Sequence, residues 1–251
     1  MSNSANDVHE TTSKAGAATS LLGRTVVVTG GNGGLGQGVV ARFRAMGARC
    51  LIADVRAVPH GEGPFAGDDG VSSRAVDLSD EGAVAAFYAE AASTPAGLWA
   101  SIHLVGGFSM APIEDTSASE LLRMFQLNAV TAFLCSREAI KAMRRTGGGR
   151  IVNVAARPAL VPTGGMVAYS AAKAAVVSLT TSLADEVKRD QIWVNAIAPS
   201  IMDTPMNRTS MPKADHSKWP SVDDVASAIV YLASPANALT TGLVMPVYGL
   251  A

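Results

Sequence analysis

A tyrosine and a lysine four residues apart, Tyr169 and Lys173, are the side chains in this sequence best suited to proton transfer. Residues four apart lie on one face of an α-helix, so a helix here would place the phenol near the ammonium group. A nearby positive charge lowers the pKa of a tyrosine and makes the phenol a usable acid or base near neutrality. The same spacing also occurs on ordinary solvated helices, so the prediction needs support from elsewhere in the chain.

A glycine-rich turn supplies that support. The residues Thr29-Gly30-Gly31-Asn32-Gly33-Gly34-Leu35-Gly36 directly follow a run of β-branched residues. Glycines at a strand-to-helix turn let the backbone approach a pyrophosphate, whose charge then lies at a helix N-terminus. Asp54 ends the next apolar run, where a carboxylate accepts hydrogen bonds from ribose hydroxyls and repels a 2′-phosphate. These residues predict a dinucleotide site that favours NAD(H) over NADP(H). Arg56 lies nearby in the sequence, and its positive charge would favour the 2′-phosphate of NADP(H).

The elements that must position these side chains alternate along the chain. Apolar runs predict strands at 25–29, 49–54, 75–77, 101–105, 150–155, 192–198 and 242–247. Helices are expected after the glycine turn and at about 80–93, 117–144, 167–189 and 221–233. Such alternation predicts right-handed crossovers and a parallel sheet. We therefore expect the α/β class: a single Rossmann-type doubly wound sheet of about seven strands with helices on both faces.

Composition narrows the possible partners. The 251 residues are 48% hydrophobic and carry a formal net charge of −1, which suits a domain that buries strands on both sides. No basic block is present, so neither nucleic acid nor a membrane surface is expected as a partner. No uninterrupted apolar stretch reaches the roughly 18 residues of a membrane span, so no membrane-spanning segment is expected. The histidines and cysteines are scattered, so no metal site is predicted.

The first 20 residues differ from the rest in being rich in Ser, Thr, Ala and Asn. They lack the apolar surface that would offset the entropy of ordering, so we expect a flexible N-terminal arm followed by one domain over 21–251. They also lack the basic start and apolar run of a secretory signal, which makes a cytoplasmic location the expectation.

Within the domain, residues 199–220 are rich in proline and predict a long lid loop over a binding site.

The glycine turn, Asp54 and the Tyr169/Lys173 pair occur in the order typical of the short-chain dehydrogenase/reductase family, which the chain resembles from Leu21 to its C-terminus. The resemblance implies an NAD(H)-dependent oxidoreductase of small molecules that forms a homodimer or homotetramer. It implies that Tyr169 is the acid/base, that Lys173 holds the nicotinamide ribose, and that Asn128 supports a proton relay. The cofactor-binding positions that it implies are Gly30, Asn32, Gly33, Gly34, Leu35, Gly36, Asp54, Asp77, Leu78, Val105, Gly106, Lys173, Pro199, Ile201 and Thr204.

Ala156 departs from the family pattern, because a serine that binds the substrate carbonyl normally stands at this catalytic position. Losing a donor to a developing oxyanion costs a factor of about 100–1,000 in rate. Either the substrate needs no such donor, or another group supplies it, or activity is weak. Two smaller departures are Ser200, which replaces a usual glycine, and His103, which replaces part of an asparagine-rich motif and is expected to be structural.

The dihydropteridine reductase branch of the family also has alanine at this position, and the chain is similar to it in Ala156-Arg157, in Val105-Gly106-Gly107-Phe108 and over 203–219. This resemblance implies hydride transfer to a quinonoid dihydropterin-like ring, with Arg157, Met206 and Trp219 as substrate contacts. One alternative is a carbonyl reductase or alcohol dehydrogenase in which Thr163, Arg157 or water replaces the serine. The other is an NAD-binding sensor with weak catalysis.

Overall fold

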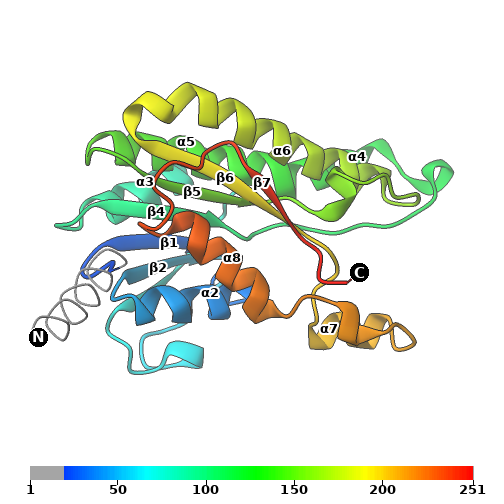
Figure 1. Ribbon diagram of the computed structural model, residues 1–251, viewed down its shortest axis with the longest axis horizontal. Coiled ribbons are helices and arrows are strands. Elements are labelled where there is room, and N and C mark those ends of the chain that lie inside the picture. Colours follow the sequence, from blue (N-terminus) through cyan, green and yellow to red (C-terminus); the bar gives the residue numbers. More distant parts are fainter. Residues whose placement is uncertain (1–19, 251) are drawn as a thin grey trace, which may run out of the picture.

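Seven strands form one parallel sheet at the centre of the computed structural model, which describes residues 20–250 (Figure 1). The sheet order is β3-β2-β1-β4-β5-β6-β7. The strands are β1 Thr25–Thr29, β2 Arg49–Asp54, β3 Val71–Ala75, β4 Leu98–His103, β5 Gly149–Val154, β6 Ile192–Pro199 and β7 Val244–Val247. The strand order reverses between β1 and β4, and in such sheets ligands bind at the carboxyl ends of the strands beside this switch point.

Helices cover both faces of the sheet, so the predicted doubly wound architecture is confirmed (Figure 1). The α-helices are α2 Gly34–Ala45, α3 Glu81–Ala92, α4 Ala118–Phe125, α5 Thr131–Arg144, α6 Val167–Val187, α7 Pro205–Ser210 and α8 Val222–Ala233. Helices α2 and α8 pack on one face, while α3, α5 and α6 pack on the other.

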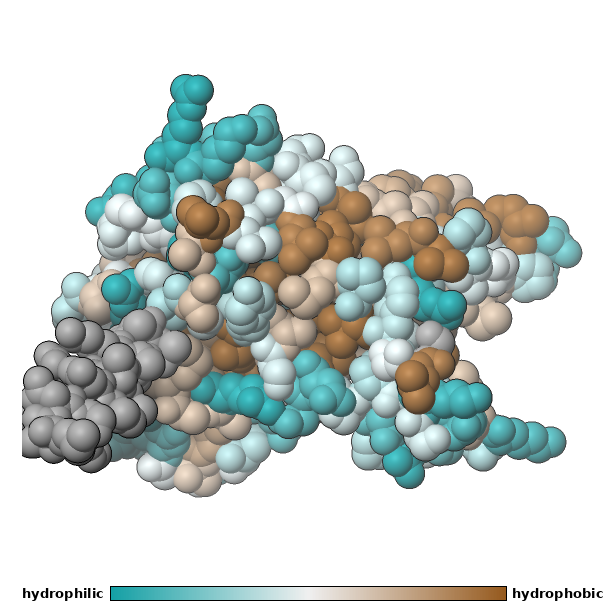
Figure 2. Space-filling model, in the orientation of Figure 1, coloured by the Kyte–Doolittle hydropathy of each residue, from teal (hydrophilic) through white to brown (hydrophobic). Residues whose placement is uncertain are grey.

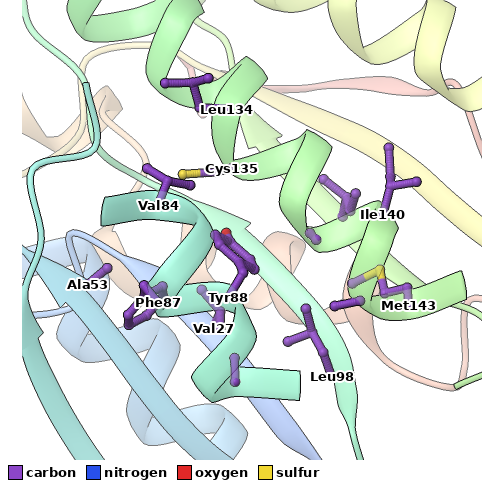
Figure 3. Packing of buried hydrophobic residues seen from close by; sticks show 14 of the residues in the cluster. Val27, Ala53, Val84, Phe87, Tyr88, Leu98, Leu134, Cys135, Ile140 and Met143 are labelled. Atoms are coloured by element: carbon purple, nitrogen blue, oxygen red, sulfur yellow. The ribbon is translucent and has the colours of Figure 1, made fainter. Parts of the chain in front are cut away.

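Strand β1 shows why the sheet needs continuous apolar runs. Val26 and Val28 pack with α2 and α8, whereas Val27 joins the cluster on the opposite face. All five β1 residues are buried, as expected for a central strand covered by helices on both sides. Figure 3 shows the cluster around Val27, in which Phe87 of α3 lies near Ala53 and Tyr88 of α3 lies on the side of α5.

Two predicted strands were misplaced. The segment expected at 75–77 is β3 at Val71–Ala75, and the strand expected at 101–105 is β4 at Leu98–His103. Strand β3 lies at the edge of the sheet, and its Ser and Arg side chains hide the apolar pattern. Strand β4 begins earlier because Leu98 is part of the buried core.

One predicted helix and one predicted loop also need correction. The continuous helix expected over 117–144 is divided by a π-helical turn at Gln126–Val130. The expected lid loop at 199–220 contains α7 and a short 3₁₀ turn at His216–Lys218. Pro205 at the first turn of α7 and the side-chain cap from Thr204 account for this helix, because both features favour helix initiation.

The expected flexible arm falls almost entirely on residues outside the described part of the chain. Within the described part, one segment, Val167–Asp190, is long and apolar enough to cross a membrane by length and composition. This segment is α6 with its following turn, and it packs against β6 and α4 within the domain. The core helix of a globular fold passes the same test, and its position here matches that role.

Candidate active site

The turn between β1 and α2 leaves backbone donors exposed at the start of a helix. Gly30 has a positive φ of 69°, and a side chain at Gly36 would meet the carbonyl oxygen of Gly30 and lie 2.5 Å from the Cα of Gly31. Helix α2 has no side-chain N-cap and no acidic residue in its first turn, so its first N–H groups face outwards unmasked. This arrangement fits a pyrophosphate group at the helix N-terminus.

Asn32 and Asp54 border this turn. Asn32 donates through its side-chain nitrogen to the carbonyl oxygen of Arg56 at 3.2 Å and to Ser73 Oγ at 3.3 Å, so it connects the turn to the segment after β2 and to the middle of β3. Asp54 ends β2, where its Oδ1 accepts the Val55 N–H at 2.8 Å. The half-buried Asp54 carboxylate therefore lies at the carboxyl edge, beside the glycine turn.

Two further predicted cofactor residues follow β3. Asp77 is exposed, and its Oδ1 accepts hydrogen bonds from the Ser79 N–H at 2.9 Å and the Ser79 hydroxyl at 2.6 Å. These bonds lower the pKa of Asp77 below its usual value. Leu78 turns inwards and packs in the core. Both residues lie at the same edge of the sheet as Asp54, because β2 and β3 run parallel.

Asn128 lies on the π-helical turn and holds the loop that follows β4. Its Oδ1 accepts the Gly107 N–H at 3.2 Å, and its Nδ2 donates to the Gly107 carbonyl at 3.0 Å. A Cβ at Gly106 would lie 2.6 Å from Asn128 Oδ1 and 3.2 Å from Lys173 Nζ. The predicted residues Gly106, Asn128 and Lys173 are therefore in one place, and the Val105-Gly106 segment is fixed against them.

Lys173 is buried and donates from Nζ to the Val154 carbonyl at 2.7 Å. Burial lowers the pKa of Lys173 to about 8 and raises the pKa of Tyr169 to about 12. The Nζ atom lies 6.0 Å from the centroid of the Tyr169 ring. The expected lowering of the Tyr169 pKa by the lysine is therefore wrong for this arrangement, because desolvation of the phenol dominates.

The loop after β4 places an aromatic side chain against Tyr169. Phe108 packs edge-to-face on Tyr169 with ring centroids 5.0 Å apart. The Ala111 N–H donates to the Gly165 carbonyl at 2.9 Å, which ties this loop to the segment before α6. Large apolar side chains are exposed in the segments that follow β4, β5 and β6, and they are Phe108, Met110, Leu160, Val161, Ile201 and Met206. Figure 2 shows much apolar surface on the α6 and α4 side of the molecule.

Ala156 is buried and precedes a short 3₁₀ turn, so no hydroxyl stands at the position that is usually serine. Arg157 is exposed, with its guanidinium 5.5 Å from the ring centroid of Tyr248. The Thr163 hydroxyl donates to the Val161 carbonyl at 3.1 Å. Tyr248 was missed by the sequence reasoning, because it lies in the C-terminal segment and belongs to no motif.

The segment after β6 is fixed at both ends. Pro199 ends β6, and Ser200 then donates its hydroxyl to the Tyr248 carbonyl at 2.8 Å. The Asp203 N–H donates to the Pro220 carbonyl at 2.9 Å, which closes the base of the segment. Ser200 has no positive φ, so the serine needs none of the conformational freedom of the usual glycine.

The remaining predicted residues of this segment have distinct environments. Thr204 caps α7 by accepting the Asn207 N–H, whereas Ile201 and Met206 are 41% and 77% exposed. Trp219 is half-buried and packs on His216 with ring centroids 4.6 Å apart. Thr204 is therefore engaged within its own helix, and Ile201 and Met206 offer free apolar surface.

His103 is part of a buried hydrogen-bond chain, so its predicted structural role is confirmed. Asn153 donates to Thr180 Oγ1 at 3.0 Å, which leaves its Oδ1 to accept from His103 Nδ1 at 2.8 Å. His103 Nε2 then accepts from the Ser101 hydroxyl at 2.8 Å, and Tyr88 Oη lies 2.7 Å from Ser101 Oγ. The chain joins α3, β4, β5 and α6, and thereby the helix that carries Tyr169.

Known proteins resemble this chain in sequence and in fold. A family profile described as short chain dehydrogenase matches residues 24–215. The chain is 32% identical to a short-chain type dehydrogenase/reductase of Picea abies, over 91% of this chain and 92% of that protein. It is 30% identical to a cis-4-hydroxycyclohexanecarboxylate dehydrogenase of Sinomonas cyclohexanicum, over 90% and 95%. A solved short-chain type dehydrogenase/reductase from Mycobacterium ulcerans has a TM-score of 0.82 at 26% identity, over 92% and 90%.

Proposed function

Because the chain belongs to the short-chain dehydrogenase/reductase family, and so is an oxidoreductase with a nicotinamide cofactor and a small-molecule substrate, we propose that it uses NADH to reduce a flat, electron-poor ring. The observation that carries this proposal is that the site has alanine at position 156 and an aromatic ring packed against Tyr169. The substrate side of Tyr169 offers the Phe108 ring, and Ala156 supplies no hydroxyl for a developing oxyanion.

The preference for NADH rests on Asp54. Its carboxylate is suited to accepting hydrogen bonds from the ribose hydroxyls, and it would repel a 2′-phosphate. The unmasked N-terminus of α2 would hold the pyrophosphate, and Asp77 with Leu78 would border the adenine. The bound nicotinamide would supply the hydride.

Tyr169 is the proton donor in this proposal. With a pKa of about 12, the phenol is protonated at neutral pH, which suits donation during reduction. Lys173 would hold the nicotinamide ribose, since its amine is buried at the base of the site and fixed by the Val154 carbonyl. Asn128 would act by holding the loop at Gly107 and by supporting a proton relay to solvent.

A quinonoid dihydropterin is the ring that we propose to test first. Hydride addition to such a ring spreads negative charge over several heteroatoms, so the reaction depends less on one oxyanion donor than carbonyl reduction does. Arg157, Met206 and Trp219 are the proposed substrate contacts. Arg157 has no carboxylate partner among the described residues, so its guanidinium is available to a carbonyl-bearing ring.

A second candidate is a dehydrogenase or reductase of alicyclic alcohols and ketones. It is favoured by the relative named for a hydroxycyclohexane carboxylate, which matches over nine-tenths of both chains. In this candidate Arg157, Thr163 or a water molecule would take the place of the usual serine.

The test measures NADH oxidation with a freshly generated quinonoid dihydropterin and with a panel of cyclic ketones, for the parent protein and for Ala156→Ser. We expect pterin turnover in the parent and little gain from the added hydroxyl. The second candidate would be supported by turnover of ketones without turnover of the pterin. In that case the ketone rate should be higher in Ala156→Ser than in the parent, by up to the factor of about 100–1,000 that an oxyanion donor provides. NADH binding without turnover of any substrate would indicate an NAD-binding sensor.

We also propose a homodimer or homotetramer and a cytoplasmic location. Apolar side chains remain exposed on the outer helices, with Leu122 of α4 at 68% and Phe133 of α5 at 44%. Contact between copies of the chain would cover such side chains. Sedimentation of the purified protein would check the assembly.

A further inference from the structure

A cavity of ≈ 340 Å³ opens at the edge of the sheet opposite the candidate active site. It lies where β4 and β5 begin, whereas the glycine turn and Lys173 lie where the strands end. Its lining includes Arg24, Trp99, Arg150 and Gln191 with the glycine turn 147–149. None of these residues belongs to the nicotinamide or substrate site.

Arg150 is a buried cation with unused hydrogen-bonding capacity. Its side chain donates to the backbone carbonyls of Gly149 and Asn237, each at 3.0 Å, while its buried Nε has no hydrogen-bond partner among residues 20–250. The residue is only 8% exposed. Its guanidinium carbon lies 4.9 Å from the Trp99 ring centroid and 5.5 Å from that of Trp193.

Arg24 adds a second positive charge to the same cavity. Its guanidinium carbon lies 4.1 Å from the Trp99 ring centroid. Burial and the charge of Arg24 together lower the pKa of Arg150 to about 10. Within the part of the chain that the structure describes, neither arginine forms an ion pair with a carboxylate. Two neighbouring cations, one of them buried, are unfavourable unless a negative charge compensates them.

A second cavity on the same edge provides a comparison. It has a volume of ≈ 230 Å³, and its lining contains Arg49 and Arg74 together with Asp69 and Glu90. Arg74 pairs with Glu90 at 2.7 Å. Here the basic and acidic side chains balance within the protein. Among the residues that the structure describes, the lining of the cavity at Arg150 contains two arginines and no acidic residue, so a compensating charge must come from outside that lining.

We propose that the Arg24/Arg150 cavity binds a small multivalent oxyanion, either a phosphate group or a dicarboxylate. The planar guanidinium groups can donate paired hydrogen bonds to such oxygens, and these charge-assisted bonds are stronger than neutral ones. Both guanidinium groups lie within 5 Å of the centroid of the same Trp99 ring, at 4.1 Å for Arg24 and 4.9 Å for Arg150. This site is independent of the proposed reductase activity.

The test follows tryptophan fluorescence in a Trp219→Phe protein, which leaves Trp99 and Trp193 as the reporters among the three tryptophans of the sequence. Inorganic phosphate and malonate are titrated separately against potassium chloride at matched ionic strength. We expect a saturable change with at least one oxyanion, and the two arms distinguish a phosphate from a carboxylate ligand. Arg24→Gln should raise the half-saturating concentration about tenfold, since one charge-assisted contact is lost.

Arg49→Gln is the matched control, because it removes an exposed arginine from the charge-balanced cavity on the same edge. It should leave the titration unchanged. Arg150→Lys keeps the buried charge and removes the planar fork, so it should weaken binding while the protein stays folded. A response that equals that of chloride, or one that Arg24→Gln does not alter, would overturn the proposal and assign any anion effect to another site.

Discussion

Lys173 and Arg150 are buried basic residues at opposite edges of the same sheet, and they differ in their protonation near neutral pH. Each donates to backbone carbonyls, and burial lowers the pKa of each, to about 8 for Lys173 and about 10 for Arg150. Lys173 therefore changes protonation near neutrality beside a phenol. Arg150 stays charged at physiological pH beside tryptophan rings. Similar burial produces a reactive pair at one edge and a fixed positive charge at the other.

The surroundings explain the contrast. At the carboxyl edge, parallel strands bring the glycine turn, Asn128 and Lys173 together around a space that backbone donors face. At the amino edge, two tryptophan rings and two backbone carbonyls lie beside the guanidinium of Arg150. We therefore expect proton transfer at the carboxyl edge alone.

The largest expected effect is that of Tyr169→Phe, which removes the proposed proton donor and keeps the ring against Phe108. A positioned general acid contributes about 10²–10⁴-fold, so kcat should fall by that factor. NADH affinity, measured by equilibrium binding, should stay within about twofold of the parent, since the phenol contributes little to ground-state binding. Tyr231→Phe is the matched control, because Tyr231 is half exposed on α8 and should tolerate the change. Turnover that survived in Tyr169→Phe would break the assignment of proton transfer to this edge.

The second effect concerns the scaffold of the glycine turn. In Gly36→Ala the new Cβ would press on the backbone of Gly30 and Gly31, which cannot move aside as a side chain would. We expect the free energy of unfolding to fall by about 3 kcal/mol or more. Gly34→Ala in the same turn meets nothing within 4 Å and should unfold like the parent. Urea titration of the cofactor-free proteins checks both, and equal stability of the two variants would contradict the packing argument.

The sequence predicted the parallel sheet well because central strands such as Thr25–Thr29 are buried on both faces and read as unbroken apolar runs. It placed β3 wrongly because an edge strand carries exposed polar residues. The family resemblance also grouped Gly106, Asn128 and Lys173 in one predicted site, and the structure places the three residues together. The direction of the Tyr169 pKa was missed, because spacing along a helix does not reveal desolvation by residues distant in the chain. Spacing along a helix also could not reveal that the Tyr248 ring lies beside the Arg157 guanidinium.

His103 gives a third buried titratable group for comparison, and its effect should appear in stability. Burial lowers the pKa of His103 to about 4, so the folded protein favours the neutral ring. An unfolded histidine has a pKa of about 6.5, and the stabilisation is therefore complete above that value and is lost as the pH falls toward 4. The loss should reach about 3 kcal/mol.

The measurement for His103 is the free energy of unfolding in urea between neutral pH and pH 4, for the parent and for His103→Asn. Asparagine does not titrate in this range, so the parent should lose more stability than the variant over the same interval. The difference between the two curves isolates the imidazole from the carboxylates that both proteins share. Parallel curves would mean that the hydrogen-bond chain through Ser101 and Asn153 accommodates a protonated ring.

The smallest expected effect at the carboxyl edge is a change in cofactor preference. Asp54→Asn keeps a polar group at the end of β2 and removes the charge that would repel a 2′-phosphate. We expect the ratio of kcat/KM for NADH to that for NADPH to fall about tenfold, which corresponds to about 1.4 kcal/mol. Asp69→Asn is the control, since it removes an exposed carboxylate at the amino edge and should leave the ratio unchanged. If both variants shifted the ratio equally, general charge would control cofactor choice; a shift in Asp54→Asn alone would locate that choice at the end of β2.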